Sequence, residues 1–159
     1  PVFLRLSRVG VPDLLPAGHT FELGKANLLR DGDAITLIAN GTISHRMVKA
    51  AAILAEQGIE ARVLNMATVR PIDVAAVVAA ARDTGAILTA EEHSIFGGLG
   101  SAIAEVVVAE APVPMKILGV PGIFAPTGSA EFLLDEFGMA PAAIAETAIA
   151  LIARKSSRT

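Results

Sequence analysis

The stretch that decides the fold reads Ala34-Ile-Thr-Leu-Ile-Ala39, then a helical pattern from Ser44 to about Gly58, then Ala61-Arg-Val-Leu-Asn-Met66. The first and last segments are short apolar runs, as buried strands are. Between them, apolar residues recur at the spacing of one helical face: Met47, Val48, Ala51, Leu54 and Ala55. Ser44 has a side chain suited to an N-cap. The stretch therefore predicts a β-α-β unit.

The same alternation continues to the end of the chain. The pattern predicts helices over about 73–82, 101–110, 129–137 and 141–154, and strands over 86–90 and 115–120. Asp73 can cap the first of these helices, and Gly85 follows shortly after its end. Strands that alternate with helices indicate an α/β protein. We expect three layers, α/β/α, around a mostly parallel sheet of about five strands.

The first 23 residues differ in character from the rest. Residues 1–8 alternate apolar and polar side chains like a half-buried strand, and residues 9–23 contain the glycines and prolines of a linker. Because the chain begins at Pro1, inside the strand pattern, we expect it to be a fragment of a longer protein. Residues 24–159 should form the domain itself.

Composition narrows the possible functions. The chain of 159 residues has no cysteine, which excludes disulfides and suits a reducing cytoplasm. The net charge of −3 lacks the basic footprint of a nucleic-acid binder. The mean hydropathy is +0.59, but the longest stretch without a charged side chain, 117–130, has 14 residues, and a membrane span needs about 20. We expect no membrane-spanning helix.

The densest polar and glycine-rich motif runs from Thr89 to Ser101, where a strand ends and a helix begins. Open α/β sheets commonly bind ligands at such junctions. The candidate site residues are Glu91, Glu92, His93, Phe96, Gly97, Gly98 and Gly100. A dinucleotide-binding fingerprint would need a small residue where Ile103 stands.

Two interpretations of this motif stay open. Neighbouring strand residues point to opposite faces, so only Glu91 and His93 can share a side, and these two groups make an incomplete metal or acid–base site. Alternatively, the glycines permit close packing and the polar residues line an interface. His19 and His45 are expected to be solvated, and we assign no catalytic or metal-binding residue.

Four motifs in order resemble the C-terminal domain of transketolase-type enzymes. They are Gly24-Lys-Ala26, the run from Arg62 through Arg70-Pro71 to Asp73, Ala90-Glu-Glu-His-Ser-Ile-Phe-Gly-Gly-Leu-Gly100, and the run from Gly128 to Gly138. The third motif is similar to that of split transketolases, whose C-terminal subunit is a separate chain. Deoxyxylulose-phosphate synthase and the β-subunits of 2-oxoacid dehydrogenases share the domain. They usually differ at His93 or Leu99.

The resemblance implies transfer of a two-carbon ketol unit between sugar phosphates, with thiamine diphosphate and Mg²⁺ held by two other domains. It implies that this fragment is inactive alone and binds no cofactor, and that it forms a homodimer through loop 93–100. Residues 1–8 resemble the last strand of the pyrimidine-binding domain. Arg8 would then bind the substrate phosphate, for which a planar guanidinium is well suited. The residues that follow, Val9-Gly10, depart from the family pattern at this point.

A different class of function remains as the alternative. The strand-end crevice around Asn40, Glu91 and Gly97 could serve a stand-alone ligand-binding or regulatory module. A bound metabolite in an isolated monomer would favour that hypothesis, and a large two-fold apolar interface would favour the transketolase interpretation.

Overall fold

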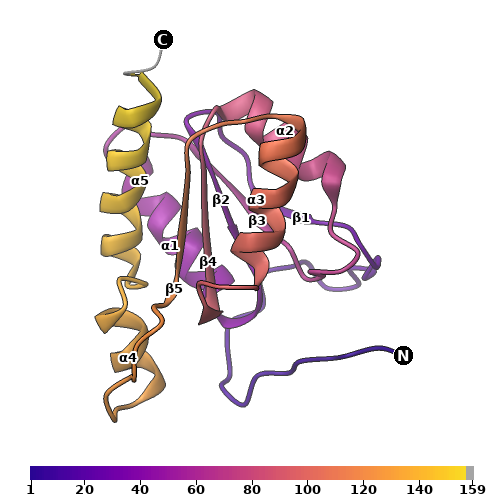
Figure 1. The fold of residues 1–159 in the computed structure, drawn as a ribbon, viewed down its shortest axis with the longest axis vertical. Helices are drawn as coiled ribbons and strands as arrows, with labels where there is room; N and C mark the ends of the chain where they lie inside the picture. The colour runs from indigo at the N-terminus through magenta and orange to yellow at the C-terminus, as the bar shows by residue number, and fades with distance from the viewer. Residues whose placement is uncertain (157–159) are drawn as a thin grey trace.

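Strands and helices alternate along the computed structural model, which describes residues 1–156 (Figure 1). The strands are β1 (Asn27–Arg30), β2 (Ile35–Ala39), β3 (Ala61–Asn65), β4 (Ile87–Ser94) and β5 (Met115–Val120). The helices are the short 3-10 turn η1 (Gly41–Ile43), α1 (Ser44–Ala55), α2 (Val74–Thr84), α3 (Leu99–Glu110), α4 (Ala130–Glu136) and α5 (Pro141–Ser156). The predicted alternation of strands and helices is confirmed.

The five strands form one sheet in the order β1-β3-β2-β4-β5. Strand β2 pairs in parallel with β3 and β4, and β4 pairs in parallel with β5, whereas β1 is antiparallel to β3. The strands that follow β2 along the chain are therefore added on both sides of it, with β3 on one side and β4 and β5 on the other. The carboxyl ends of β2 and β4 meet where the direction of strand addition changes, which is the usual ligand-binding position of an open α/β sheet.

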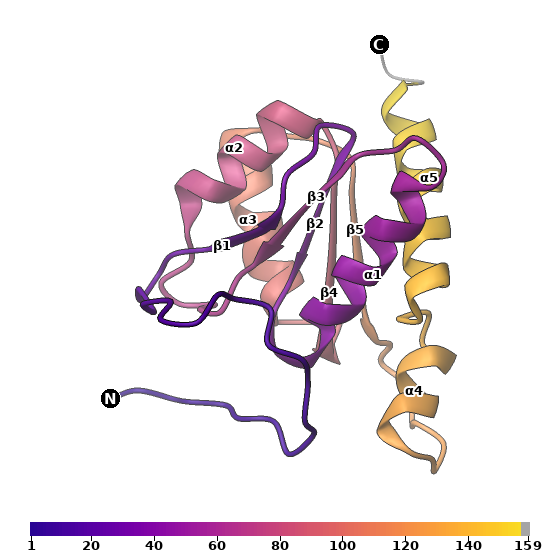
Figure 2. The same ribbon diagram turned by 180° about the vertical axis from the view of Figure 1, so that it is seen from behind.

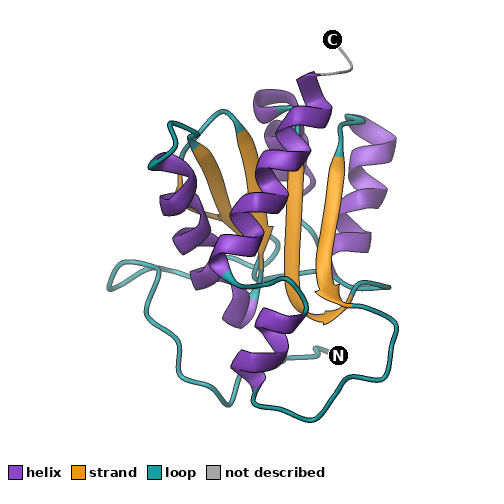
Figure 3. Ribbon diagram, turned by 90° about the vertical axis from the view of Figure 1, so that its left-hand side faces the viewer, coloured by secondary structure: helices purple, strands orange, loops and turns teal. Residues whose placement is uncertain are grey.

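Helices cover both faces of the sheet. Figures 2 and 3 show α1 and α5 on one face and α2 and α3 on the other. Each face has its own apolar cluster, built on α1 and α5 around Met47 and Leu151 and on α2 and α3 around Val77 and Ile103. This three-layer arrangement confirms the predicted fold class.

Local sequence signals explain some helix ends and not others. Asp73 caps α2 as predicted, with its Oδ1 atom 3.0 Å from the Ala76 nitrogen, and Gly85 ends the helix at φ +65°. The prediction that Ser44 caps α1 is wrong. Turn η1 precedes that helix, Ile43 occupies the cap position, and the Ser44 hydroxyl is buried without a hydrogen-bond partner in the described part of the chain.

Two segments at the amino end differ from the pattern. Strand β1 was not predicted. It has four residues at the sheet edge and leaves Leu28 56% exposed, so it carries little period-2 signal. Residues 1–8 form no strand here and are exposed, because nothing in the described chain pairs with them. Their assignment to another domain stays a prediction, as does the assignment of residues 9–23, which have no regular structure, to a linker.

By length and composition alone, one segment, Ala130–Lys155, is a candidate for crossing a membrane. From the sequence we expected no membrane-spanning helix, because the longest stretch without a charged side chain has only 14 residues. In the structure this segment is two helices, α4 and α5, and α5 buries Ile144, Ala148 and Leu151 in the core cluster that it shares with α1. The apolar side chains of α5 are explained by that packing.

Candidate functional site

The loops that follow β2 and β4 meet at the carboxyl edge of the sheet. The Thr42 hydroxyl, in the first loop, donates a hydrogen bond of 2.7 Å to the Glu92 carboxylate at the end of β4. Thr42 is 8% exposed, so this bond lies largely out of water. Asn40, which lies between β2 and η1, is half-buried, and its side chain makes no cap hydrogen bond to that turn.

The two glutamates point to opposite faces of the sheet, as the strand alternation predicted. Glu92 reaches the α1 side, whereas Glu91 reaches the α3 side and is 5% exposed. The Gly100 backbone nitrogen, in the first turn of α3, donates to Glu91 Oε1 over 3.3 Å. The cap residue Gly98 has no side chain for this task, so Glu91 caps the helix from outside it.

The glycines around Glu91 leave room for the carboxylate. A Cβ atom at Gly98 would lie 2.7 Å from the Glu91 Cδ atom, and one at Gly100 would lie 2.9 Å from the Thr89 hydroxyl. Real Cβ atoms do not approach other atoms so closely. Gly98 and Gly100 therefore leave room for side chains of the same chain, whereas the expectation that the glycines let two backbones approach at an interface stays a prediction.

His93 and Phe96 lie on the surface. His93 is exposed, and its Nδ1 atom is 2.8 Å from the Ser94 carbonyl, which can only accept, so Nδ1 carries the proton. Phe96 is 66% exposed, and one edge of its ring lies 3.0 Å from the Cβ position of Gly122. Gly97 adopts φ +74° and donates its N–H to the Ser101 hydroxyl over 2.9 Å. This loop presents an aromatic ring and an imidazole outward.

Within residues 1–156, the two strand-end glutamates do not form a paired carboxylate site. Glu91 and Glu92 lie on opposite faces and each accepts a bond from a protein donor, so they cannot act as a pair. Among the described residues no group of three or more His, Asp or Glu side chains could hold a metal ion. The residues present do not fit a metal–diphosphate group.

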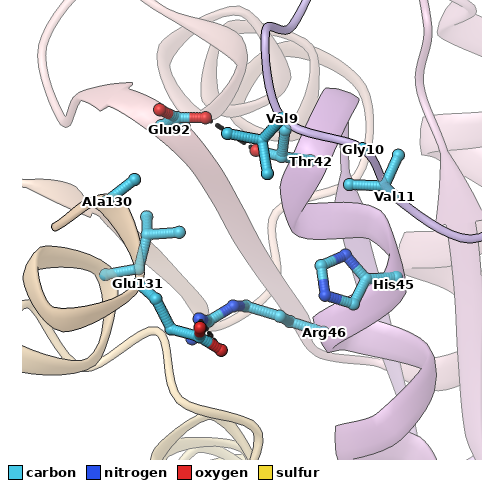
Figure 4. A pocket seen from close by; sticks show the side chains of 10 residues that line it. Val9, Gly10, Val11, Thr42, His45, Arg46, Glu92, Ala130 and Glu131 are labelled. Carbon is cyan, nitrogen blue, oxygen red and sulfur yellow. Dashed lines mark hydrogen bonds and ion pairs between the residues drawn. The ribbon is translucent and has the colours of Figure 1, made fainter.

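A pocket of about 170 Å³ lies beside the Thr42–Glu92 bond (Figure 4). Residues from the segment before β1, from η1, α1, β4 and α4 line it: Val9, Gly10, Val11, Thr42, His45, Arg46, Glu92, Ala130, Glu131 and Leu134. His45 is half-buried, and its Nδ1 atom is buried with no hydrogen-bond partner in the described chain, so the expectation of a solvated His45 is wrong. Glu91 and Gly97 do not line this pocket.

Sequence reasoning missed Arg46, the charged residue that joins α4 to the body of the domain. Its side chain is 7% exposed, forms an ion pair with Asp135, lies 3.7 Å from Glu131, and donates a hydrogen bond of 3.1 Å to the Met139 carbonyl. Its neighbour Met47 is fully buried. A charge on the apolar side of an amphipathic helix was the signal that could have identified it.

Arg8, the predicted phosphate-binding residue, is exposed and makes no hydrogen bond or ion pair within residues 1–156.

Shifted pKa values occur far from these loops, beside the start of β3. The Gly32 N–H, followed by the Arg62 guanidinium, lowers the pKa of Asp31, and a hydrogen bond to Asp83 is the main cause that raises the pKa of Arg62. These three charged groups form an exposed network with no link to the candidate site.

Comparison with known proteins identifies the family. The family model described as "Transketolase, C-terminal domain" matches residues 24–144. The chain is 40% identical over 153 residues to a subunit of the apulose-4-phosphate transketolase of Phocaeicola vulgatus, covering 96% of this chain and 49% of that protein. It is 41% identical over 158 residues to "6-deoxy-6-sulfo-D-fructose transketolase subunit SqwH" of a Clostridium species, covering 99% and 49%.

A more distant relative and a solved structure are also similar to this chain over most of its length. A 1-deoxy-D-xylulose-5-phosphate synthase of Trichormus variabilis is 36% identical over 150 residues, which are 92% of this chain and 24% of that protein. The solved structure "Split gene transketolase, inactive beta4 tetramer" superposes with a TM-score of 0.88 at 38% identity, covering 93% of this chain and 48% of that one. The chain spans about half the length of the transketolase subunits it matches.

The fold is a three-layer α/β/α sandwich in which both strand-end carboxylates accept hydrogen bonds from protein donors. The chain belongs to the transketolase C-terminal domain family.

Proposed function

We propose that this chain is the C-terminal, structural part of a thiamine-diphosphate-dependent transketolase of the split type. The observation that carries the proposal is its identity of about 40% to two transketolase subunits over almost its whole length. The reaction would be transfer of a two-carbon ketol unit from a ketose phosphate to an aldose, in the cytoplasm. Thiamine diphosphate, when bound to such an enzyme, supplies the stabilisation of the carbanion.

The task of this chain within that enzyme is to hold the catalytic parts in place. Glu91 caps α3, and Glu92 ties the end of β4 to the loop after β2, so both carboxylates have structural partners. Neither strand-end carboxylate is free to activate a cofactor, and the fragment alone should be inactive. The diphosphate- and pyrimidine-binding parts would come from the rest of the enzyme, as a domain or a subunit.

Homodimerisation is the second part of the proposal. Phe96, in loop 93–100, and Val108, on α3, are 66% and 74% exposed, and no described residue covers them. Space is also free beside Gly97, where an added Cβ would meet nothing within 4 Å. Loop 93–100 and α3 would therefore pack against the same surface of a second copy.

Arg8 and the segment before the linker complete the proposal. Residues 1–8 would be the last strand of the pyrimidine-binding domain, and Arg8, at its end, would bind the phosphate of the substrate. Exposed apolar side chains support the assignment, because leaving them in water is unfavourable unless another surface covers them; they are Val2, Phe3, Leu4 and Leu6.

Calorimetry with thiamine diphosphate and Mg²⁺ tests the proposal. The isolated chain should release no heat of binding, whereas the enzyme assembled with its other half should bind saturably at micromolar cofactor. Saturable micromolar binding by the isolated chain would overturn the assignment, and so would an assembled enzyme without ketol transfer.

The alternative, a ligand-binding module at the strand-end crevice, has less support. The pocket beside Thr42 has a volume of about 170 Å³, below the range of about 300–1,000 Å³ that holds most small-molecule ligands, and a second pocket of about 380 Å³, beside Gly41 and Asn65, lies at the low end of that range. In the smaller pocket the most buried charge, Arg46, is already neutralised by Asp135. Deoxyxylulose-phosphate synthase is the other enzyme class to which the whole protein could belong, since relatives with that name share the domain.

A further inference from the structure

Exposed apolar side chains gather at one end of the molecule. Among the described residues, ten of the fifteen exposed large hydrophobic side chains come from the amino-terminal segment, taken here as residues 1–11, from the loops after β4 and β5, or from α4. They are Val2, Phe3, Leu4, Leu6, Val9, Val11, Phe96, Ile123, Phe124 and Phe132. Figures 1 and 3 show the amino-terminal segment and the loop leading to α4 below the sheet, at the carboxyl ends of its parallel strands.

The most exposed part of this surface is the apolar loop, which we define as residues 121–124, directly after β5. Ile123 is 62% exposed, and Phe124 is exposed over its whole side chain. The loop has a defined shape, because the Ile123 N–H donates to the Pro121 carbonyl over 2.6 Å and the Phe96 ring approaches Gly122. Ordered apolar side chains that water surrounds usually contact a partner.

The amino-terminal segment shows where that partner must lie. Arg5 donates a hydrogen bond of 2.9 Å to the Glu92 carbonyl, and Val9 lines the pocket beside Thr42. From Leu6 to Val9 the chain advances three residues, which span at most about 11 Å even when fully extended. A body that takes residues 2–6 into its sheet is therefore held against the carboxyl edge of this sheet.

We propose that the apolar loop docks onto the domain or subunit that accepts residues 2–6 as a strand. This inference rests on the proposed function, because it needs a second half of the enzyme. A second copy of the chain is the other conceivable occupant, because loop 93–100, whose Phe96 ring approaches Gly122, is proposed to pack against one. Residues 2–9 favour the body that holds them, because Arg5 and Val9 tie that body directly to this edge. The contact surface of that body should be apolar, to match Ile123 and Phe124.

Photo-crosslinking in the assembled transketolase tests the docking. Benzoylphenylalanine replaces Phe124 in one sample and Leu28, an exposed residue of β1, in the control. We expect the Phe124 sample to crosslink to residues outside 1–159, at least tenfold more than the control does. Crosslinks into residues 24–159 of a second copy, or a yield no higher than the control's, would overturn the inference.

A pair of substitutions provides an independent readout. Phe124→Asp should release the contact and increase trypsin cleavage after Arg8 about tenfold in the assembled enzyme, and Leu28→Asp, at an exposed position of β1, should not. Equal cleavage rates in the two variants would overturn the docking. Because wild-type ketol transfer is measured in the same preparation, an inactive wild-type enzyme counts against the proposed function, and an active one with misdirected crosslinks counts against the docking alone.

Discussion

Arg46→Ala should detach α4 from the domain at a measurable cost in stability. Arg46 makes one ion pair with Asp135 and one hydrogen bond to the Met139 carbonyl, and its side chain is 7% exposed. A hydrogen bond to a charged group is worth about 1.5–3 kcal/mol, but Asp135 is 51% exposed and water will solvate it once the arginine is gone. The Glu131 contact, at 3.7 Å to an 86% exposed side chain, should contribute little. We expect a loss of about 2–3 kcal/mol.

Thermal unfolding followed by circular dichroism measures this loss. For a chain of this length, 1 kcal/mol lowers the Tm by about 2–4 °C, so Arg46→Ala should lower it by about 5–10 °C. Lys49→Ala is the matched control, because Lys49 lies on the exposed side of the same helix and its loss should change stability by under about 0.5 kcal/mol. Asp135→Ala closes a double-mutant cycle with a coupling of about 1–2 kcal/mol. An Arg46→Ala variant as stable as the Lys49→Ala control would refute this account of α4.

Three further substitutions test the candidate site. Glu91→Ala should lower the free energy of unfolding, measured with urea, by about 1–2 kcal/mol, because α3 loses its cap. Glu91→Gln keeps the oxygen that accepts the hydrogen bond and should retain most of the wild-type stability. Equal losses in the two variants would contradict capping. In the assembled enzyme, Arg8→Ala should raise KM about ten- to a hundredfold for phosphorylated substrates and little for unphosphorylated analogues, whereas equal effects on both would exclude phosphate binding. Phe96→Asp should shift sedimentation equilibrium toward monomer with an unchanged circular-dichroism spectrum, and an unshifted dimer would argue against that interface.

The sequence predicts the fold well where a residue's neighbours in the chain decide its conformation. The strand cores, the Asp73 cap and the Gly85 helix end depend on local spacing, and the structure confirms all of them. Strand β1 escaped prediction because pairing with β3, not its own pattern, makes it a strand. Residues 1–8 carry a strand pattern and form none, because a strand also needs a neighbouring strand.

The candidate site was predicted in part. Alternation along β4 predicts that Glu91 and Glu92 point to opposite faces of the sheet, and their hydrogen-bond partners confirm it. What each carboxylate contacts could not be predicted, because Gly100 and Thr42 come from different loops that only tertiary packing brings together. Arg46 was missed for the same reason, since its partners lie about ninety residues away along the chain.

The position of α5 has a consequence for how the chain is made. This helix supplies Ile144, Ala145, Ala148 and Leu151 to the core cluster that it shares with α1, which lies about a hundred residues earlier. Until the ribosome has translated α5, the apolar face of α1 that packs against α5 is exposed, and other nascent chains can bind to it. We therefore expect a polypeptide stalled before residue 141 to be held by chaperones, and release to follow once α5 has emerged.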